Sequence, residues 1–248
     1  MSVSHCVLLC GGSGARVKPA SDFYNKALIT LDDHFIIDYP IHTLISMGIK
    51  HITVILGGDH FADIVSYLQG GEKWGIDINY IFQKSPDGIA QAINLAKKYV
   101  ENEDSFMVML SDNIYSTPIV WSASINYNPL FSQIALYKHQ KLNRFGVASI
   151  YNNKIVKIEE KPKTINFECS NYAITGTYIF NRDFFSMFKK LKKSARGEYE
   201  ITSILQQYLD INELQYTVLD KHSFWGDAGT FESISQIREL IKVGKIKI

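Results

Sequence analysis

The first half of the chain alternates short apolar runs with segments whose apolar residues recur at helical spacing. The pattern predicts strands at residues 6–10, 52–56, 76–82 and 106–110, with helices between them at 36–47, 61–68 and 89–100. The short continuous apolar runs VILG and FMVML fit strands buried on both faces. Strands that alternate with helices in this way predict an α/β fold with a mostly parallel sheet flanked by helices.

After about residue 115 the pattern changes to shorter strands, which indicates an added β-rich part. Strands are predicted at 133–137, 146–150, 154–158 and 173–180, and helices at 183–191, 201–209 and 231–243. Asn152-Asn153 between two of these strands is a candidate hairpin turn. No linker-like segment or repeat interrupts the sequence, so we expect a single domain over 1–248. Its first half, 1–115, would mainly bind nucleotide, and 116–248 would mainly bind a second substrate.

Composition excludes several classes of partner. The chain has 26 Lys and Arg against 25 Asp and Glu, so no overall field attracts nucleic acid or a membrane surface. It lacks an apolar run of about 18 residues and a basic N-terminal signal segment, which predicts a cytoplasmic protein. The odd number of cysteines, Cys6, Cys10 and Cys169, favours reduced thiols that serve in packing.

A glycine-rich turn follows the first predicted strand and suggests a polyphosphate site. The turn contains Gly11, Gly12 and Gly14, and it is followed by Arg16 and Lys26. Glycines allow the backbone N–H groups to approach a ligand closely, and two nearby cations indicate that this ligand is anionic. The alternative is a strand-to-helix turn that binds nothing.

Spacing excludes the two commonest phosphate motifs. A Walker A loop needs Gly-Lys-Ser/Thr at the end of the turn, where Arg16 and Val17 stand instead. A dinucleotide fingerprint starting at Gly12 needs a third glycine at the position of Val17. A dehydrogenase is therefore disfavoured.

Carboxylates after predicted strands suggest a metal and a second phosphorylated substrate. Asp112 follows the run 106–110, and Asp227 is framed by glycines before the last helix. Together they suit Mg²⁺, whereas each alone could be a turn or helix-capping residue. Glu160 and Lys161 could contact a polar phosphorylated co-substrate. The alternative is that they belong to a run of charged residues exposed to solvent. The sequence shows no Ser/His/Asp or Cys/His nucleophile at a recognisable spacing, so the expected chemistry is transfer by positioning and electrostatics.

An ordered set of motifs gives these segments a family context. The following motifs occur in order from Cys6 to about Ile234: GGSGAR, NK, QKSPDGIAQA, SDN, FGV, EEKP, NYAITGTYIF, ARGEYEIT and WGDAGT. The set resembles the bacterial sugar-1-phosphate nucleotidyltransferase family, and most closely its glucose-1-phosphate thymidylyltransferases. The resemblance implies a Rossmann-like nucleotidyltransferase fold. It also implies an Mg²⁺-dependent reaction in which dTTP and glucose 1-phosphate give dTDP-glucose and pyrophosphate.

The resemblance also implies roles for individual residues. Nucleotide contacts would come from Gly11, Gly12, Gly14, Gln83, Gly88 and Asp112. The catalytic cations would be Arg16, Lys26 and Lys161, which contact pyrophosphate, the phosphates of the nucleotide and the sugar phosphate, respectively. The sugar would be bound by Gly146, Glu160 and Tyr172, and the metal by Asp112 and Asp227.

Departures from the family pattern leave alternatives open. Ala15, Thr30, Ser111 and Ala228 replace usual residues without removing a charged group. The C-terminal helices of longer members, linked to subunit contacts and a regulatory nucleotide site, have no counterpart here. A short form without feedback control is therefore expected, and any homo-oligomer would be a dimer rather than a tetramer. The same chemistry with UTP or CTP and another sugar phosphate is an alternative, as is a non-catalytic regulatory subunit.

Overall fold

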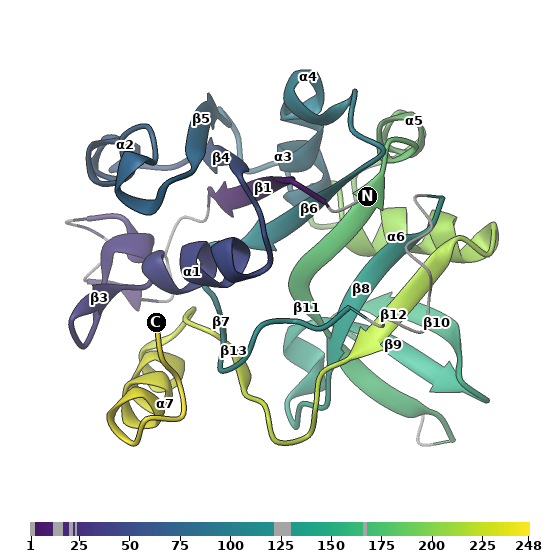
Figure 1. Cartoon of the computed structure of the whole chain (residues 1–248). Helices are drawn as coiled ribbons and strands as arrows, with labels where there is room; N and C mark the ends of the chain where they lie inside the picture. The colour runs from purple at the N-terminus through teal and green to yellow at the C-terminus, as the bar shows by residue number, and fades with distance from the viewer. Residues whose placement is uncertain (1–2, 12–16, 20–21, 23, 122–129, 166–167) are drawn as a thin grey trace.

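A parallel sheet forms the first part of the molecule, as the alternation predicted (Figure 1). The computed structural model describes residues 3–11, 17–19, 22, 24–121, 130–165 and 168–248. Strand β1 (His5–Cys10) lies between β6 (Ser105–Leu110) and β4 (His51–Leu56), and β5 (Asp77–Phe82) follows β4 at the edge. All three pairings are parallel, so the carboxyl ends of these strands meet at one edge of the sheet.

Antiparallel strands extend this sheet into the β-rich second part. The long strand β11 (Ser170–Asn181) pairs with β6, and also with β8 (Ser132–Tyr137) and β9 (Gly146–Tyr151). Beyond them lie β10 (Lys154–Glu160), antiparallel to β9, and β12 (Leu214–Val218), parallel to β8. The predicted mixed α/β fold is thus confirmed.

The hairpin predicted between β9 and β10 is also confirmed. Tyr151 pairs with Lys154 across the turn, and Asn152 and Asn153 both have positive φ, 49° and 58°. A two-residue turn of this kind matches the twist of antiparallel strands, and asparagine tolerates the left-handed conformation well.

Helices cover both faces of the sheet. One face carries α1 (Asp38–Ser46) and α2 (Phe61–Leu68). The other carries α3 (Ile89–Leu95), α4 (Lys97–Val100), α5 (Phe184–Phe188) and α6 (Ile201–Asp210). Short 3₁₀ helices also occur at η3 (Lys26–Leu28), η4 (Glu72–Trp74) and η5 (Leu142–Arg144).

Strand β1 is the centre of both cores because its side chains alternate between the faces. Val7 and Leu9 pack with the cluster that contains α3, α5 and α6. Cys6, Leu8 and Cys10 pack with the cluster beneath α1 and α2. The burial of Cys6 and Cys10 as unpaired thiols agrees with their predicted role in packing.

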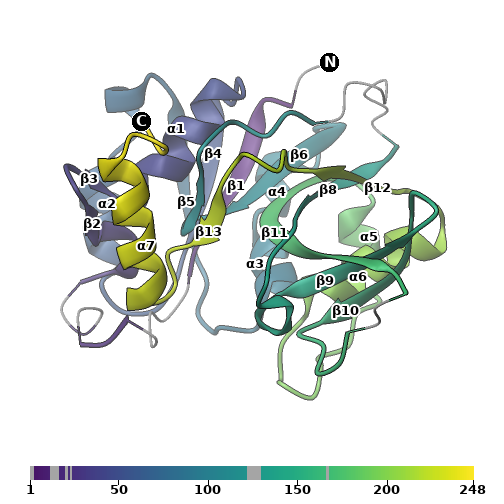
Figure 2. The ribbon, with the colours of Figure 1, turned by 90° about the horizontal axis from the view of Figure 1, so that it is seen from below.

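The last helix, α7 (Phe231–Lys242), packs beside the parallel part rather than the β-rich part (Figure 2). Thr230 begins it with a capping box in which its hydroxyl accepts from the N–H of Ser233. Ile234 and Ile237 pack in a third core cluster with Leu31. Among the described residues, no helix has the length and apolar character needed to cross a bilayer.

The structure corrects several sequence-based boundaries. The helix predicted at 89–100 is divided into two helices at Ala96. The ψ of Ala96 is 0°, and its N–H group donates to the carbonyl oxygens of Asn94 and Ile93, so α3 ends there. The helix predicted at 183–191 covers only Phe184–Phe188. Strand β12 and the short strands β2 (Thr30–Leu31) and β3 (His34–Phe35) were not predicted. The two-residue strands β2 and β3 are too short to give a periodic signal, whereas β12 alternates apolar Leu214, Tyr216 and Val218 with polar residues and was missed.

A buried histidine at the start of β1 gives the fold a pH-dependent stability. His5 is 6% exposed, and its Nε2 lies 2.8 Å from the hydroxyl of Thr53. Burial, and secondarily the neighbouring His51, lowers the pKa of His5 from 6.5 to about 4. The unfolded chain therefore binds a proton between these pH values that the folded chain excludes, and stability falls as the pH falls through this range.

We expect the wild type to lose about 2 kcal/mol more free energy of unfolding between pH 7 and pH 4.5 than His5→Gln, because the variant has no group that titrates there. Urea unfolding at both pH values measures the difference. Equal losses in the two proteins would contradict a neutral buried imidazole.

Candidate functional site

Two adjoining cavities lie at the carboxyl ends of the parallel strands, where ligands bind in open α/β sheets. The first has a volume of about 280 Å³ and the second about 460 Å³. Ile89, Leu110 and Asp112 line both, so the cavities form one cleft with two lobes that meet at Asp112.

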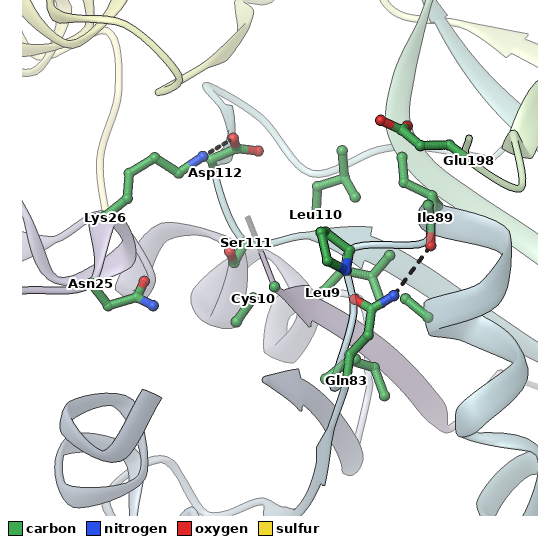
Figure 3. A pocket seen from close by; sticks show the side chains of 15 residues that line it. Leu9, Cys10, Asn25, Lys26, Gln83, Ile89, Leu110, Ser111, Asp112 and Glu198 are labelled. Carbon is green, nitrogen blue, oxygen red and sulfur yellow. Dashed lines mark hydrogen bonds and ion pairs between the residues drawn. The ribbon is translucent and has the colours of Figure 1, made fainter. Parts of the chain in front are cut away.

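An ion pair lies at the junction of the lobes. Lys26 Nζ is 2.5 Å from Asp112 Oδ2, and the two side chains are 13% and 15% exposed. Figure 3 shows the lysine directed at the carboxylate across the first lobe. Asp112 follows β6, and Lys26 begins η3 directly after Asn25, whose side chain accepts from the N–H of Ala27. The structure therefore brings together a predicted metal ligand and a predicted phosphate-binding cation.

The far end of the first lobe is lined by Gly11, Gln83 and Gly88. Gln83 follows β5, and its Nε2 donates to the carbonyl oxygen of Gly88 at 3.4 Å and to Gln91 Oε1 at 2.6 Å. A Cβ on Gly11 would lie 3.0 Å from Gln83 Oε1, so a side chain there would crowd the amide. The predicted nucleotide-binding residues that the structure describes thus gather in one lobe.

Gly88 occupies a position that only glycine fits. Its φ is 103°, a conformation that other residues rarely adopt, and a Cβ there would lie 2.6 Å from the carbonyl oxygen of Tyr199. The backbone of Tyr199 donates to Asp87 and accepts from Ala90 on either side of Gly88. These bonds hold the loop that opens α3 against the β-rich part of the molecule.

The second lobe contains Asp227, which a short strand pair places beside Asp112. Strand β13 (Trp225–Asp227) runs antiparallel to β7 (Asn113–Tyr115), with Asp227 opposite Asn113. The N–H of Ala228 donates to the carbonyl oxygen of Asp112 at 2.8 Å. The carboxylate of Asp227 also lies 3.5 Å from the guanidinium of Arg144.

The donor set fits Mg²⁺ only in part. Two carboxylates at neighbouring strand positions suit an ion that takes its other ligands from phosphate and water. Within the described ranges, no group of three or more His, Cys, Asp or Glu side chains is arranged to hold a metal without such help. A metal here would therefore be held jointly by Asp112, Asp227 and a phosphorylated substrate.

Asn113 connects the two strands through buried hydrogen bonds. Its Oδ1 accepts from the indole N–H of Trp225 at 2.5 Å and from the N–H of Gly176 at 3.1 Å. Its Nδ2 donates to Asp112 Oδ1 at 3.2 Å. A Cβ on Gly176 would lie 2.6 Å from this amide, which explains the glycine within β11. One side chain that is 1% exposed thus fixes Asp112 relative to β11 and β13.

The outer wall of the second lobe carries Glu160 and Lys161. Glu160 Oε2 accepts from Thr202 Oγ1 at 3.3 Å, and its Oε1 accepts from Arg196 Nη1 at 3.2 Å. Lys161 Nζ lies 3.6 Å from the same Oε1. Gly146 lines the same lobe opposite Thr202. The predicted charge pair is therefore part of a cleft and is not only a solvated run.

Four predicted site residues are not placed in the cleft by the structure. Gly12, Gly14 and Arg16 lie outside the described residues. Tyr172 is not among the residues that line the two lobes, and it packs against the first core cluster from β11. Their roles remain predictions.

Cys10 lines the first lobe but is not a nucleophile. It is 3% exposed, and burial raises the pKa of its thiol to about 12, against a weaker opposing hydrogen bond from Ser111. A protonated thiol does not attack phosphorus at neutral pH. This agrees with the prediction of chemistry without a covalent intermediate.

Sequence reasoning assigned no role to several residues that the cleft uses. These are Gln91, Asn113, Arg144, Arg196 and Thr202. Each lies within or directly beside a motif that was recognised, but polarity alone does not show which side chains of a motif face inward.

We expect Asn113→Ala to lower the free energy of unfolding by about 3 kcal/mol or more, because it leaves two buried N–H donors unpaired at roughly 1–3 kcal/mol each. Trp225→Phe removes one donor while Gly176 keeps its acceptor, so its loss should be nearer 1 kcal/mol. Urea unfolding compares the two variants. Equal losses would show that Asn113 does not connect the strands.

Comparison with known proteins agrees with this geometry. Residues 5–243 match the family model described as nucleotidyl transferase. A glucose-1-phosphate thymidylyltransferase of Mycolicibacterium smegmatis is 32% identical over 97% of this chain and 83% of its own length. The corresponding protein of Neisseria meningitidis is 33% identical over 95% of this chain and 82% of its own length.

Solved structures show the same fold. A candidate glucose-1-phosphate thymidylyltransferase from Bacillus anthracis, in complex with sucrose, superposes with a TM-score of 0.88 at 36% identity. The superposition covers 96% of this chain and 95% of that one. A UDP-glucose pyrophosphorylase has a TM-score of 0.81 at 18% identity, with 97% of this chain and 99% of that one covered, and shows the shared fold alone. The resemblance carried by the sequence motifs is confirmed, and the chain belongs to the nucleotidyl transferase family of enzymes.

Proposed function

We propose that this protein forms dTDP-glucose and pyrophosphate from dTTP and glucose 1-phosphate, with Mg²⁺ as cofactor. The observation that carries the proposal is the cleft of two lobes that meet at Asp112. One lobe offers an amide and backbone groups suited to a base, and the other a carboxylate and a lysine suited to a sugar phosphate. The relatives named glucose-1-phosphate thymidylyltransferase support the choice of thymine and glucose.

The nucleotide would occupy the first lobe, which is lined mostly by residues of 1–115. Gln83 and the backbone at Gly88 would contact the base, and Gly11 would leave room beside it. Lys26 would bind the phosphates, and the position of its ammonium group at the junction of the lobes supports this role. Gly12, Gly14 and Arg16 are assigned to the nucleotide from the sequence motif.

The sugar phosphate would occupy the second lobe, which is lined mainly by residues of 116–248. Glu160 can accept hydrogen bonds from sugar hydroxyls, and Gly146, its partner on the adjacent strand β9, leaves space beside it. Lys161 would bind the phosphate. Tyr172 is retained as a sugar contact on the sequence motif alone.

The reaction needs no general base. An oxygen of the sugar phosphate is mostly ionised at neutral pH, because the second pKa of a phosphate monoester is about 6. This oxygen forms a bond to the α-phosphorus of the nucleotide, while the bond from that phosphorus to the bridging oxygen breaks and pyrophosphate leaves. The barrier is repulsion between two anions, which Lys26 and Lys161 lower from opposite lobes. Asp112 and Asp227 would hold Mg²⁺, which would further neutralise the phosphate charge.

Incubation with dTTP and glucose 1-phosphate, followed by mass spectrometry of the product, tests the proposal. A panel that includes UTP, CTP and other sugar phosphates addresses the alternatives of the same class. Release of pyrophosphate from no pair would contradict the proposal. Nucleotide binding without turnover would favour a regulatory subunit.

We expect Asp112→Asn to lower kcat/KM by about 10²–10³-fold, since it removes a carboxylate that would hold Mg²⁺ at the reacting phosphates. The thermal midpoint should change by only a few degrees, because the residue follows a strand and is not part of the core. Asp77→Asn is the charge-matched control, on an exposed side chain at the other end of the sheet. A large fall in midpoint together with activity would mark Asp112 as structural.

We expect Lys161→Met to raise the KM for glucose 1-phosphate by about 10–100-fold, because the variant loses one charge-assisted hydrogen bond to the sugar phosphate. The KM for dTTP should stay within a factor of three or so of the wild type. Lys163→Met, on a neighbouring exposed lysine, serves as control. An equal rise in both KM values would place Lys161 elsewhere than at the sugar phosphate.

A further inference from the structure

A turn at residues 194–198 reaches both lobes of the cleft from the β-rich part. Its Arg196 donates from Nη1 to Glu160 Oε1 at 3.2 Å and from Nη2 to Glu198 Oε2 at 2.9 Å. Glu160 lines the second lobe, and Glu198 lines the first. One guanidinium thus holds a carboxylate in each lobe, and the reaction described above gives the carboxylate of the first lobe no role.

The backbone on either side of Glu198 fixes this residue at the wall of the first lobe. Its carbonyl oxygen accepts from the N–H of Ser194 at 2.8 Å. The N–H of Gly197 donates to the carbonyl oxygen of Ser194, and the positive φ of Gly197, 78°, is one that glycine adopts readily. The next residue, Tyr199, donates its N–H to the carbonyl oxygen of Asp87 at 2.8 Å. Glu198 is therefore anchored both within its own turn and to the loop that opens α3.

The carboxylate of Glu198 has one oxygen available to a ligand. Figure 3 shows this side chain on the wall that Ile89 also forms, directed across the lobe toward the side of Asp112 and Lys26. Arg196 contacts Oε2, and among the residues that the structure describes no donor contacts Oε1. The ion pair with Arg196 also offsets the charge of the carboxylate, so it repels a triphosphate less. Glu198 thus offers a hydrogen-bond acceptor to the occupant of the lobe.

The nucleotide has only two kinds of group that could donate to this acceptor. In the proposed function the base lies beside Gln83 and the phosphates lie at Lys26, so the pentose that joins them lies between these two ends. The oxygens of the phosphates only accept hydrogen bonds. The N3–H of thymine would lie at the Gln83 end of the lobe, which leaves the 3′-hydroxyl of the deoxyribose as the donor for Glu198. A hydroxyl that donates to a carboxylate makes a charge-assisted hydrogen bond.

We propose that Glu198 accepts a hydrogen bond from the 3′-hydroxyl of the nucleotide pentose, and that Arg196 positions the carboxylate for this contact. The inference rests on the proposed function and adds to it a requirement for a free 3′-hydroxyl on the nucleotide. Deoxyribose and ribose both carry this group. The contact therefore selects against nucleotides that lack or block the 3′-hydroxyl, and it does not distinguish dTTP from UTP.

Equilibrium binding of dTTP and 2′,3′-dideoxythymidine triphosphate tests this directly, because the two nucleotides differ only in the 3′-hydroxyl. Calorimetry in the presence of Mg²⁺, without sugar phosphate, measures binding independently of turnover. We expect the wild type to bind dTTP about 10–100-fold more tightly than the dideoxynucleotide, the range for one hydrogen bond to a charged group. This comparison needs no variant protein.

Glu198→Ala separates recognition of the hydroxyl from a structural role. The variant lacks the acceptor, so the ratio of the two dissociation constants should fall to within about twofold of one. The dideoxynucleotide should bind the variant at least as tightly as the wild type, because a negative charge near the triphosphate has been removed. Glu101→Ala is the matched control, since Glu101 is also ion-paired, to Lys97 at 3.4 Å, and lines neither lobe. It should keep the wild-type ratio.

The outcomes distinguish this inference from the proposed function. A wild type that binds both nucleotides equally overturns the inference and leaves the proposed transferase intact. A Glu198→Ala variant that weakens both nucleotides by the same factor also overturns it, because the residue would then only hold the turn. An equal fall of the ratio in Glu101→Ala overturns it as well, since the effect would not belong to the cleft. A wild type that binds neither nucleotide overturns the proposed function itself.

Discussion

The pairing of two three-residue strands, β7 and β13, determines where the charges of the cleft lie. It sets Asp227 opposite Asn113 and therefore next to Asp112, although more than a hundred residues separate the two aspartates in sequence. The hydrogen bonds of Asn113 to Trp225 and Gly176 tie this pair to the main sheet. Without that connection the two halves of the chain would each hold one carboxylate, and the two could not together hold the proposed Mg²⁺.

Each aspartate at the cleft has a cation beside it. Lys26 contacts Asp112, and Arg144 lies near Asp227. A partly buried carboxylate is costly to leave without a counter-charge, so these contacts stabilise the arrangement in the free protein. In the proposed reaction the same side chains would lie close to the phosphates of two anionic substrates, where positive charge lowers the barrier.

Much of the fold and part of the cleft could be predicted from local sequence. Strands β1, β4 and β6 are apolar along most of their length and are separated by helices, so their burial and parallel order follow from pattern alone. Gln83 and Asp112 were expected at the cleft because they follow predicted strands, and Lys26 because it follows the glycine-rich turn. By contrast, β13 contains Trp225, Gly226 and Asp227, which give no strand signal, and it forms only because β7 is nearby.

The sequence by itself determined the class of fold, the family and the types of side chain available for binding phosphate and a base, because these depend on local periodicity and on motifs in order. Only the tertiary structure decided which of those side chains meet and how they are turned. The carbonyl of Gly88 orients Gln83, and Asn113 orients Asp112. Such contacts depend on distances between separate elements, and these distances are fixed only when the sheet and its helices pack.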